Sequence, residues 1–104
     1  MSGLYAYVLD RALRAWIYVE FTTDRRTVTD YAVVLYVEDD TGTIDTVRVY
    51  DGAHGENEMH RYTRQGGKQA AEIVSRDTLG AGMRAAIEEI KHSYREMIDS
   101  WRRR

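Results

Sequence analysis

The sequence predicts an α+β domain in which an antiparallel four- or five-stranded meander sheet carries one long C-terminal helix on one face. Three observations lead to this fold class. Apolar and polar residues alternate over much of the first two thirds of the chain, which is the period of half-buried strands. Short segments rich in Gly, Asp and Thr separate the alternating stretches, as turns do. The last third repeats its apolar residues every three or four positions, which is the helical period.

Composition sets the outer limits on size and class. The 104 residues suffice for about one small core, so residues 1–104 are expected to form a single domain. The 15 basic and 17 acidic residues give a net charge of -2, which excludes the broad positive charge of a general nucleic-acid binder, so any anion site must be local. The absence of cysteine and of an apolar run of about 20 residues predicts no disulfide, no membrane span and a cytoplasmic protein.

The strand predictions follow from the alternating segments. One segment is apolar on both faces at its centre, as a strand inside a sheet is. Residues 4–13 fit a helical stripe as well as a strand, so both alternatives stay open. The pair Gly66 and Gly67 can turn the chain into a short fifth strand. The predicted strands are residues 14–22, 31–38, 44–51 and 58–64, with the fifth over residues 70–74.

The C-terminal helix is predicted from Thr78 to about Arg103, with Asp77 or Ser75 as its N-cap. At ~1.5 Å per residue it approaches 40 Å in length, whereas an eight-residue strand spans ~27 Å. The last turns, with Ile98 and Trp101, are therefore expected to overhang the sheet. The apolar stripe consists of Leu79, Met83, Ile87, Ile90, Tyr94, Ile98 and Trp101.

The segment Val49–Tyr62 holds the residues best suited to chemistry. Imidazole titrates close to neutral pH, so His54 and His60 can act as a general acid and base. Asp51 can orient one ring, and Arg61 can stabilise phosphate charge. Strand alternation places Arg61 on the opposite face from His60, unless a bulge redirects it. The four candidate catalytic residues are His54, His60, Asp51 and Arg61.

Two other interpretations of this segment stay open. The same side chains include imidazole and carboxylate metal ligands, but a third imidazole could come only from His92 on the distant helix, so neither a metal nor another cofactor is expected. Alternatively, Gly52, Gly55 and Asn57 form a plain connecting loop, with the two histidines as ordinary polar residues.

A second candidate surface is the sheet face turned away from the helix. An open face with aromatic and basic side chains can stack unpaired RNA bases and hold phosphates. It equally suits a homodimer or a protein partner, because tyrosine and tryptophan are enriched in interfaces. The aromatic residues expected to share it are Trp16, Tyr18, Tyr36, Tyr50, His60 and Tyr62, and the candidate substrate-binding residues are Tyr50, Tyr62, Arg48 and Arg64.

The stretch YDGAHGENEMHRY resembles the YDNAHG…HRY signature of small bacterial and phage proteins that are similar to the TumE-like toxins of toxin–antitoxin pairs. Gly52 stands where many of these relatives have asparagine. The resemblance implies a toxin that arrests growth and a helix-turn-helix antitoxin as its partner. Carried over residue by residue, it marks Tyr50, Asp51, His54, Gly55, His60, Arg61 and Tyr62.

Two functions are therefore expected from the sequence. The first is a toxin-like module that cleaves RNA without a metal, with His54 and His60 sharing the proton transfers. The alternative is a non-catalytic interaction protein, encoded by a phage or within an operon. Such a protein would bind its partner through the aromatic sheet face or the overhanging end of the helix.

Overall fold

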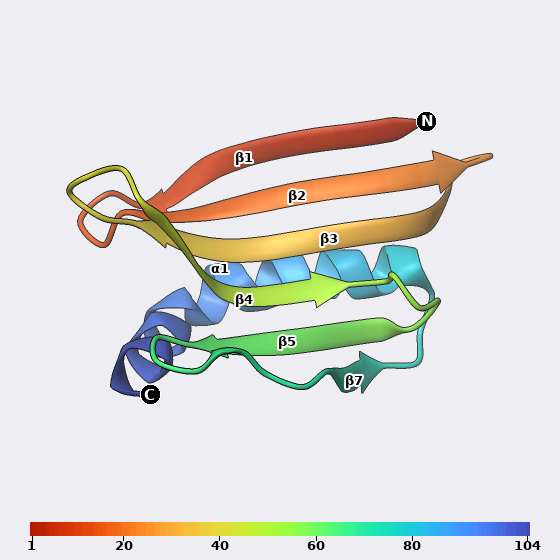
Figure 1. Ribbon diagram of the computed structural model, residues 1–104. Helices are drawn as coiled ribbons and strands as arrows, with labels where there is room; N and C mark the ends of the chain where they lie inside the picture. Colours follow the sequence, from red (N-terminus) through yellow and green to blue (C-terminus); the bar gives the residue numbers. More distant parts are fainter.

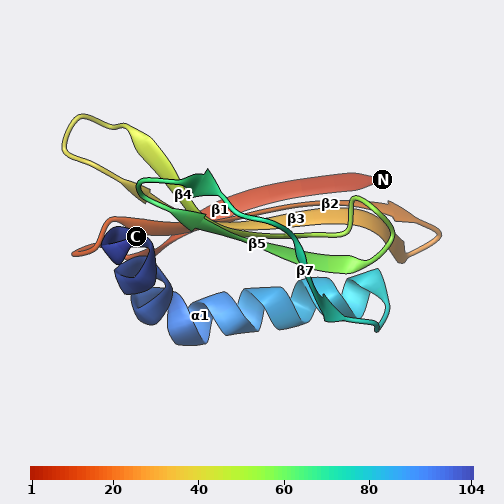
Figure 2. The ribbon, with the colours of Figure 1, turned by 60° about the horizontal axis from the view of Figure 1, so that its bottom comes forward.

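The computed structural model describes residues 1–104 and confirms the α+β class (Figure 1). Strands β1 to β6 follow one another across an antiparallel sheet in chain order, and β7 returns to pair with β5. Helix α1 covers one face of this sheet, and the other face has no covering layer (Figure 2). The sheet has seven strands, more than the four or five expected. The elements are β1 (Ser2–Asp10), β2 (Ala15–Asp24), β3 (Thr27–Glu38), β4 (Ile44–Asp51), β5 (Asn57–Thr63), β6 (Gly67–Lys68), β7 (Glu72–Ser75) and α1 (Leu79–Arg103).

The N-terminal segment, for which helix and strand were both open, is strand β1 at the edge of the sheet. It pairs antiparallel with β2 from Ser2 to Asp10. Gly3 allows this pairing, because a Cβ atom there would lie 2.4 Å from Cζ of Phe21. Strand β6 was also not predicted from the sequence. It has only two residues, which are too few to show an alternating pattern.

The core lies between the sheet and α1. Alternate residues of β2 and β3 point toward the helix, and Ile17, Val19, Val33 and Leu35 are all fully buried there. Ile90 of α1 is also 0% exposed and meets this layer from the other side. Burial of an aliphatic side chain of this size stabilises the fold by about 1.5–3 kcal/mol.

Helix α1 begins at Leu79, one residue later than expected, and its N-cap is Thr78 instead of Asp77 or Ser75. The Thr78 side chain accepts a hydrogen bond from the Ala81 backbone N–H at 3.2 Å. Asn57 fixes this end of the helix to the sheet: its Oδ1 accepts from the Tyr31 hydroxyl at 2.7 Å, and its Nδ2 donates to the Asp77 carbonyl at 2.9 Å. Asp77 and Ser75 cap only the turn that precedes the helix.

The expected overhang of the helix is wrong. Ile98 is 1% exposed and Trp101 is 7% exposed, because the last turns of α1 curve toward the β5–β6 hairpin (Figure 2). The backbone N–H of Arg64 donates to the Trp101 carbonyl at 3.1 Å, which ties the hairpin to the helix. Ile87 is only half-buried, and Gly82, Ala86 and Met97 complete the buried face. No helix of the protein combines the length and apolar character needed to cross a membrane.

The alternation expected in β4 is interrupted by a bulge. The pairing with β3 shifts register between Leu35 and Tyr36, where Val47 is the extra residue between Arg48 and Thr46. As a result Val47 and Tyr50, which alternation places on opposite faces, are both buried on the helix side.

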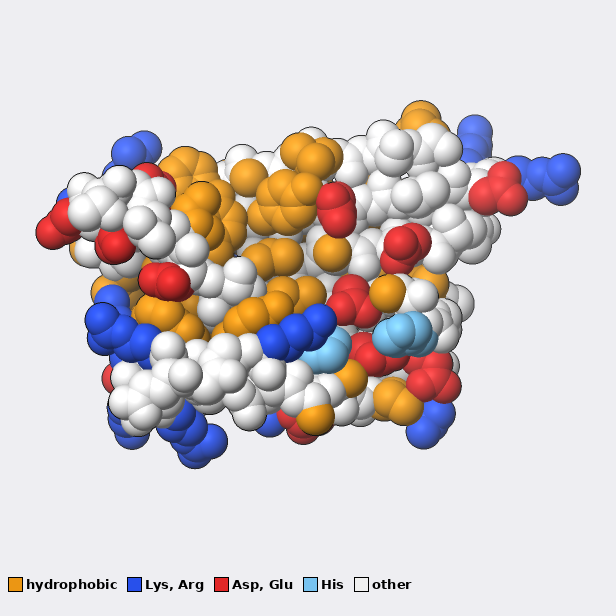
Figure 3. Space-filling model, in the orientation of Figure 1, with side chains coloured by type: hydrophobic (Ala, Val, Ile, Leu, Met, Phe, Trp, Pro, Cys, Tyr) orange, Lys and Arg blue, Asp and Glu red, His pale blue; other side chains and the backbone are white.

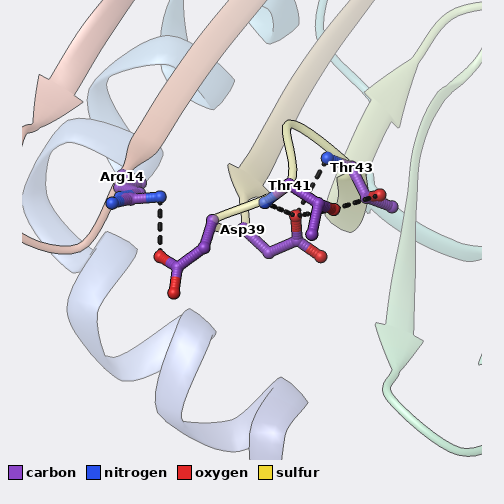
Figure 4. Close-up of polar contacts among 5 residues, drawn as sticks. Arg14, Asp39, Thr41 and Thr43 are labelled. Atoms are coloured by element: carbon purple, nitrogen blue, oxygen red, sulfur yellow. Dashed lines mark hydrogen bonds and ion pairs between the residues drawn. The ribbon is translucent and has the colours of Figure 1, made fainter.

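The β3–β4 connection is stabilised by its own polar residues (Figure 4). One carboxylate oxygen of Asp39 accepts from the Thr41 hydroxyl at 2.7 Å and from the backbone N–H groups of Thr41 and Thr43. These bonds hold the pKa of Asp39 below its usual range, with the Thr41 side chain contributing most. Beside it, Asp40 forms an ion pair with Arg14 at 2.8 Å, which links this loop to the β1–β2 hairpin.

Candidate active site on the open sheet face

The open face carries aromatic side chains at one end and histidines with carboxylates at the other. Trp16 and Tyr36 are register partners across β2 and β3, and their rings lie nearly parallel with centroids 6.3 Å apart. Tyr18 follows on the same face and donates a hydrogen bond to Glu20 at 2.8 Å. Figure 3 shows this apolar surface over the first strands, with both histidines and several acidic groups on the far side of the same face. The expected open face with Trp16, Tyr18 and Tyr36 is present.

The β4–β5 connection brings the histidine-containing loop back over the sheet. Asp51 and Glu58 are register partners across the two strands, so their side chains share one face. The Gly52 N–H donates to the Tyr31 carbonyl, and Gly55, with φ of 78°, donates its N–H to the Gly52 carbonyl. A left-handed residue at this turn reverses the chain, as glycine permits. His54 is therefore held at the tip of a short, closed loop.

His54 pairs with Glu58. Its Nδ1 lies 2.8 Å from Oε1 of Glu58, and the carboxylate side chain is 10% exposed while the imidazole is 78% exposed. A carboxylate can only accept, so Nδ1 carries the proton in this hydrogen bond. With Nδ1 committed to Glu58, Nε2 is the ring nitrogen left for a substrate, which is the atom that a general base would use.

His60 lies between two hydrogen-bond acceptors. Its Nδ1 is 3.0 Å from the Gln69 carbonyl oxygen, and its Nε2 is 4.0 Å from Oδ2 of Asp51. The imidazole is 13% exposed, so this ring is far less accessible than His54. Nδ1 is within hydrogen-bond distance of the carbonyl, whereas Nε2 is at ion-pair distance from the carboxylate. An N–H group on either ring nitrogen therefore faces an oxygen, which is an arrangement that a proton donor can use.

The two pairs form one cluster because their carboxylates are cross-strand neighbours. No group of three or more His, Asp or Glu side chains has an arrangement that could hold a metal ion. With neutral imidazoles the cluster carries two negative charges, and protonation of both rings would cancel them. Lys68 is the register partner of Tyr62, which lies two residues beyond His60, so strand alternation gives Lys68 a position on the His60 face.

Arg61 does not join this cluster. The bulge that would have redirected it is absent from its pairing with β4, in which Arg61 is opposite Arg48 on the helix side. Its guanidinium forms an ion pair with Glu72 of β7 at 2.5 Å. The expectation that Arg61 stabilises charge beside the two histidines is therefore not met.

Three of the expected substrate-binding residues also leave the open face. Tyr50 is 2% exposed within the core, and Arg48 lies on the same side, because the bulge at Val47 reverses the alternation of β4. Arg64 follows the end of β5, and its guanidinium lies 5.8 Å from the centre of the Trp101 ring on the helix. Of the four, Tyr62 alone has a register position on the His60 face, and it is half-buried.

Sequence reasoning singled out neither Glu58 nor Lys68. Glu58 is the direct partner of His54. The alternation of Glu58 with His60 along β5 was the available signal, since residues two apart share a face. Lys68 gave no comparable signal, because its position depends on the two-residue strand β6.

The comparison with known proteins identifies the family. Residues 2–104 match the family described as domain of unknown function DUF7718. The chain belongs to this family. The DUF7718 match spans the whole sheet and α1, so the open face and its histidine cluster lie within the family domain. Searches of curated proteins and of solved structures found no significant match.

Proposed function

We propose that this DUF7718 domain is a toxin-like enzyme that cleaves RNA on its open sheet face without a metal ion. The observation that carries the proposal is the pair of histidine–carboxylate contacts within the β4–β5 hairpin, His54 of the loop with Glu58 and His60 with Asp51. Two oriented imidazoles, one exposed and one placed between acceptors, match the base and the acid of a phosphoryl-transfer reaction.

In the proposed reaction His54 is the general base. Its exposed Nε2 takes the proton from a ribose 2′-hydroxyl, and the 2′-oxygen attacks the adjacent phosphorus. Glu58 stabilises the imidazolium that forms, because its carboxylate accepts a hydrogen bond from Nδ1–H throughout the reaction. His60 gives a proton to the departing 5′-oxygen, so the products are a 2′,3′-cyclic phosphate and a free 5′-hydroxyl.

Lys68 takes the role that the sequence suggested for Arg61. The reaction builds negative charge on the phosphoryl oxygens, and a cation at that point lowers the barrier. Lys68 has the register position for this on the His60 face, whereas Arg61 is paired with Glu72 on the other face. The Trp16 and Tyr36 rings lie on the same face and offer a stacking surface for unpaired bases.

The biological setting proposed here comes from the resemblance to TumE-like toxins. A toxin of this kind arrests growth until a helix-turn-helix antitoxin binds it. The open face, with no layer of its own to cover it, is the surface on which such a partner would block both the histidines and the aromatic residues.

The experiment is expression in bacteria together with RNA cleavage in vitro. Expression of the wild type should arrest growth, and purified protein should cut single-stranded RNA in the presence of EDTA to give 2′,3′-cyclic phosphate ends. His54→Ala and His60→Ala should remove both effects, while His92→Ala, on an exposed helix position, should leave them unchanged. Products with other ends, or cleavage that EDTA abolishes, would contradict the mechanism.

A second candidate function, self-association, has its own observation in strand β1. Met1 exchanges both backbone hydrogen bonds with Thr23, so by alternation the N–H and C=O groups of Ser2, Leu4, Ala6 and Val8 point away from the sheet. No charged residue or proline interrupts Ser2–Leu9. A second copy could pair with this edge and make one continuous sheet. Light scattering that shows a monomer at millimolar concentration would exclude it.

A further inference from the structure

A second recess lies on the other side of β5 from the histidine cluster. It has a volume of about 300 Å³ and sits between the last turns of α1 and strands β4 and β5. The turn after β6 and the start of β7 close its outer side. The residues that matter for its chemistry are Arg48, Arg61, Glu72, Arg104, Ser100 and Trp101.

The charge of this recess is opposite to that of the chain. It is lined by three arginines, Arg48, Arg61 and Arg104, and by one acid, Glu72, so the side chains sum to a formal charge of about +2. The whole protein has a net charge of -2. Arg48 and Arg61 also face each other directly in the β4–β5 register, and like charges in that position repel. The fold alone gains nothing from this arrangement.

One of the two facing arginines forms no ion pair. Arg61 is paired with Glu72 at 2.5 Å, whereas Arg48 has no carboxylate partner and lies beside the Tyr50 hydroxyl. Nε of Arg48 is buried and makes no hydrogen bond. A buried donor without an acceptor is costly, and natural structures rarely keep one without a reason. An oxygen-bearing anion in the recess would supply the missing acceptor.

We infer that this recess binds a phosphate monoester of about nucleotide size. The guanidinium fork of an arginine matches two phosphate oxygens, so Arg48 and Arg61 can hold one phosphate group from neighbouring strands. Ser100 and Thr63 add hydroxyl groups to the lining of the recess. Met97 and Trp101 of α1 add apolar lining, which suits the planar part of a nucleoside. This site is separate from the proposed cleavage site.

Titration of the full chain with adenosine 5′-monophosphate, adenosine and inorganic phosphate tests the inference by calorimetry. We expect saturable binding of the monophosphate, at least tenfold weaker binding of adenosine, and loss of affinity as salt rises. Arg48→Gln should weaken binding of the monophosphate at least tenfold. The matched control is Arg76→Gln, which changes an exposed arginine outside the recess and should leave the affinity unchanged.

Glu72→Gln should change the affinity for the monophosphate in the opposite direction from Arg48→Gln. It removes the one acid of the recess and frees Arg61, so the monophosphate should bind several-fold more tightly while all three arginines remain. This result does not depend on whether Arg48→Gln folds. His54→Ala should bind like the wild type, so failure of the proposed cleavage leaves this test intact. Absence of saturable binding at millimolar ligand, equal affinity for adenosine, or unchanged affinity in Glu72→Gln would overturn the inference.

Discussion

The two faces of the sheet differ in how well folding explains their residues. On the helix face the inward-facing residues at the centre of β2 and β3 are buried and apolar, and the one buried amide, Asn57, has partners for both its groups. On the open face the side chains are half-exposed, and Glu58 is 8% exposed although its only polar partner is the exposed His54. The ion pair between a buried carboxylate and a solvent-exposed imidazole contributes little to the stability of the fold, because the cost of burying the carboxylate offsets the attraction.

This difference separates residues that make the fold from residues that need another explanation. Removing a helix-face side chain should destabilise the protein. Removing a member of the His54, Glu58, Asp51 and His60 cluster should change chemistry while leaving stability nearly intact.

Ile90→Ala should have the largest effect. Ile90 is fully buried between α1 and the sheet, so the substitution leaves a cavity and should lower the free energy of unfolding by about 2–5 kcal/mol. Urea denaturation followed by circular dichroism measures this. Ile44→Ala is the matched control, because Ile44 is 58% exposed and should change stability by less than about 0.5 kcal/mol. Equal losses at both positions would show that burial does not distinguish them.

The Tyr31–Asn57 hydrogen bond should come next. Asn57→Ala leaves the Tyr31 hydroxyl and the Asp77 carbonyl without this partner, and we expect a loss of about 1–3 kcal/mol. In a double-mutant cycle with Tyr31→Phe, the two losses should be non-additive by at least about 0.5 kcal/mol. Full additivity would mean that the two side chains do not interact in solution.

Alkaline pH should lower the free energy of unfolding, because two tyrosines on the helix face lose their protons. Burial raises the pKa of Tyr31 and of Tyr50 to about 12 from the ordinary value of 10. The folded state therefore holds these protons more tightly than the unfolded state, so stability is fully present below pH 10 and falls as pH rises from 10 through 12. Tyr50→Phe should be nearly neutral at pH 7, since the Tyr50 hydroxyl has no hydrogen-bond partner, and should reduce the alkaline loss. An unchanged pH profile in Tyr50→Phe would contradict this assignment.

The smallest effect on stability is expected at the open-face carboxylates. Glu58→Gln and Asp51→Asn keep the shape of each side chain and remove only its charge, so the free energy of unfolding should change by about 0.5 kcal/mol or less. Thermal denaturation near neutral pH measures this change in stability. A loss above about 2 kcal/mol at either position would assign the cluster to the fold instead.

The sequence predicted much of the fold because its patterns are periodic. The four main strands and the extent of α1 follow from periods of two and of three to four residues, and these were confirmed. The overhang at Ile98 and Trp101 was wrong, because helix length alone does not reveal curvature toward the β5–β6 hairpin. Strand β1 stayed ambiguous until its pairing with β2 decided it.

The candidate site was less predictable, because it depends on register. A single extra residue at Val47 moves Tyr50 and Arg48 to the helix side, and no composition signal marks that bulge. His54 and His60 were identified from residue type alone. His60 takes its face from the β4–β5 pairing, and His54 is placed on it by its contact with Glu58. Glu58 was missed, since its role requires the loop to fold back so that His54 lies against it.

The most direct test of the division between the two faces is the RNA-cleavage rate of His54→Ala, measured with its free energy of unfolding. The account predicts a rate lower by about 10²–10⁴-fold, which is the usual contribution of a positioned acid or base, with stability within about 0.5 kcal/mol of the wild type. Added imidazole should restore part of the lost rate. A cleavage rate equal to that of the wild type, or a loss of rate that merely follows a loss of stability, would contradict it.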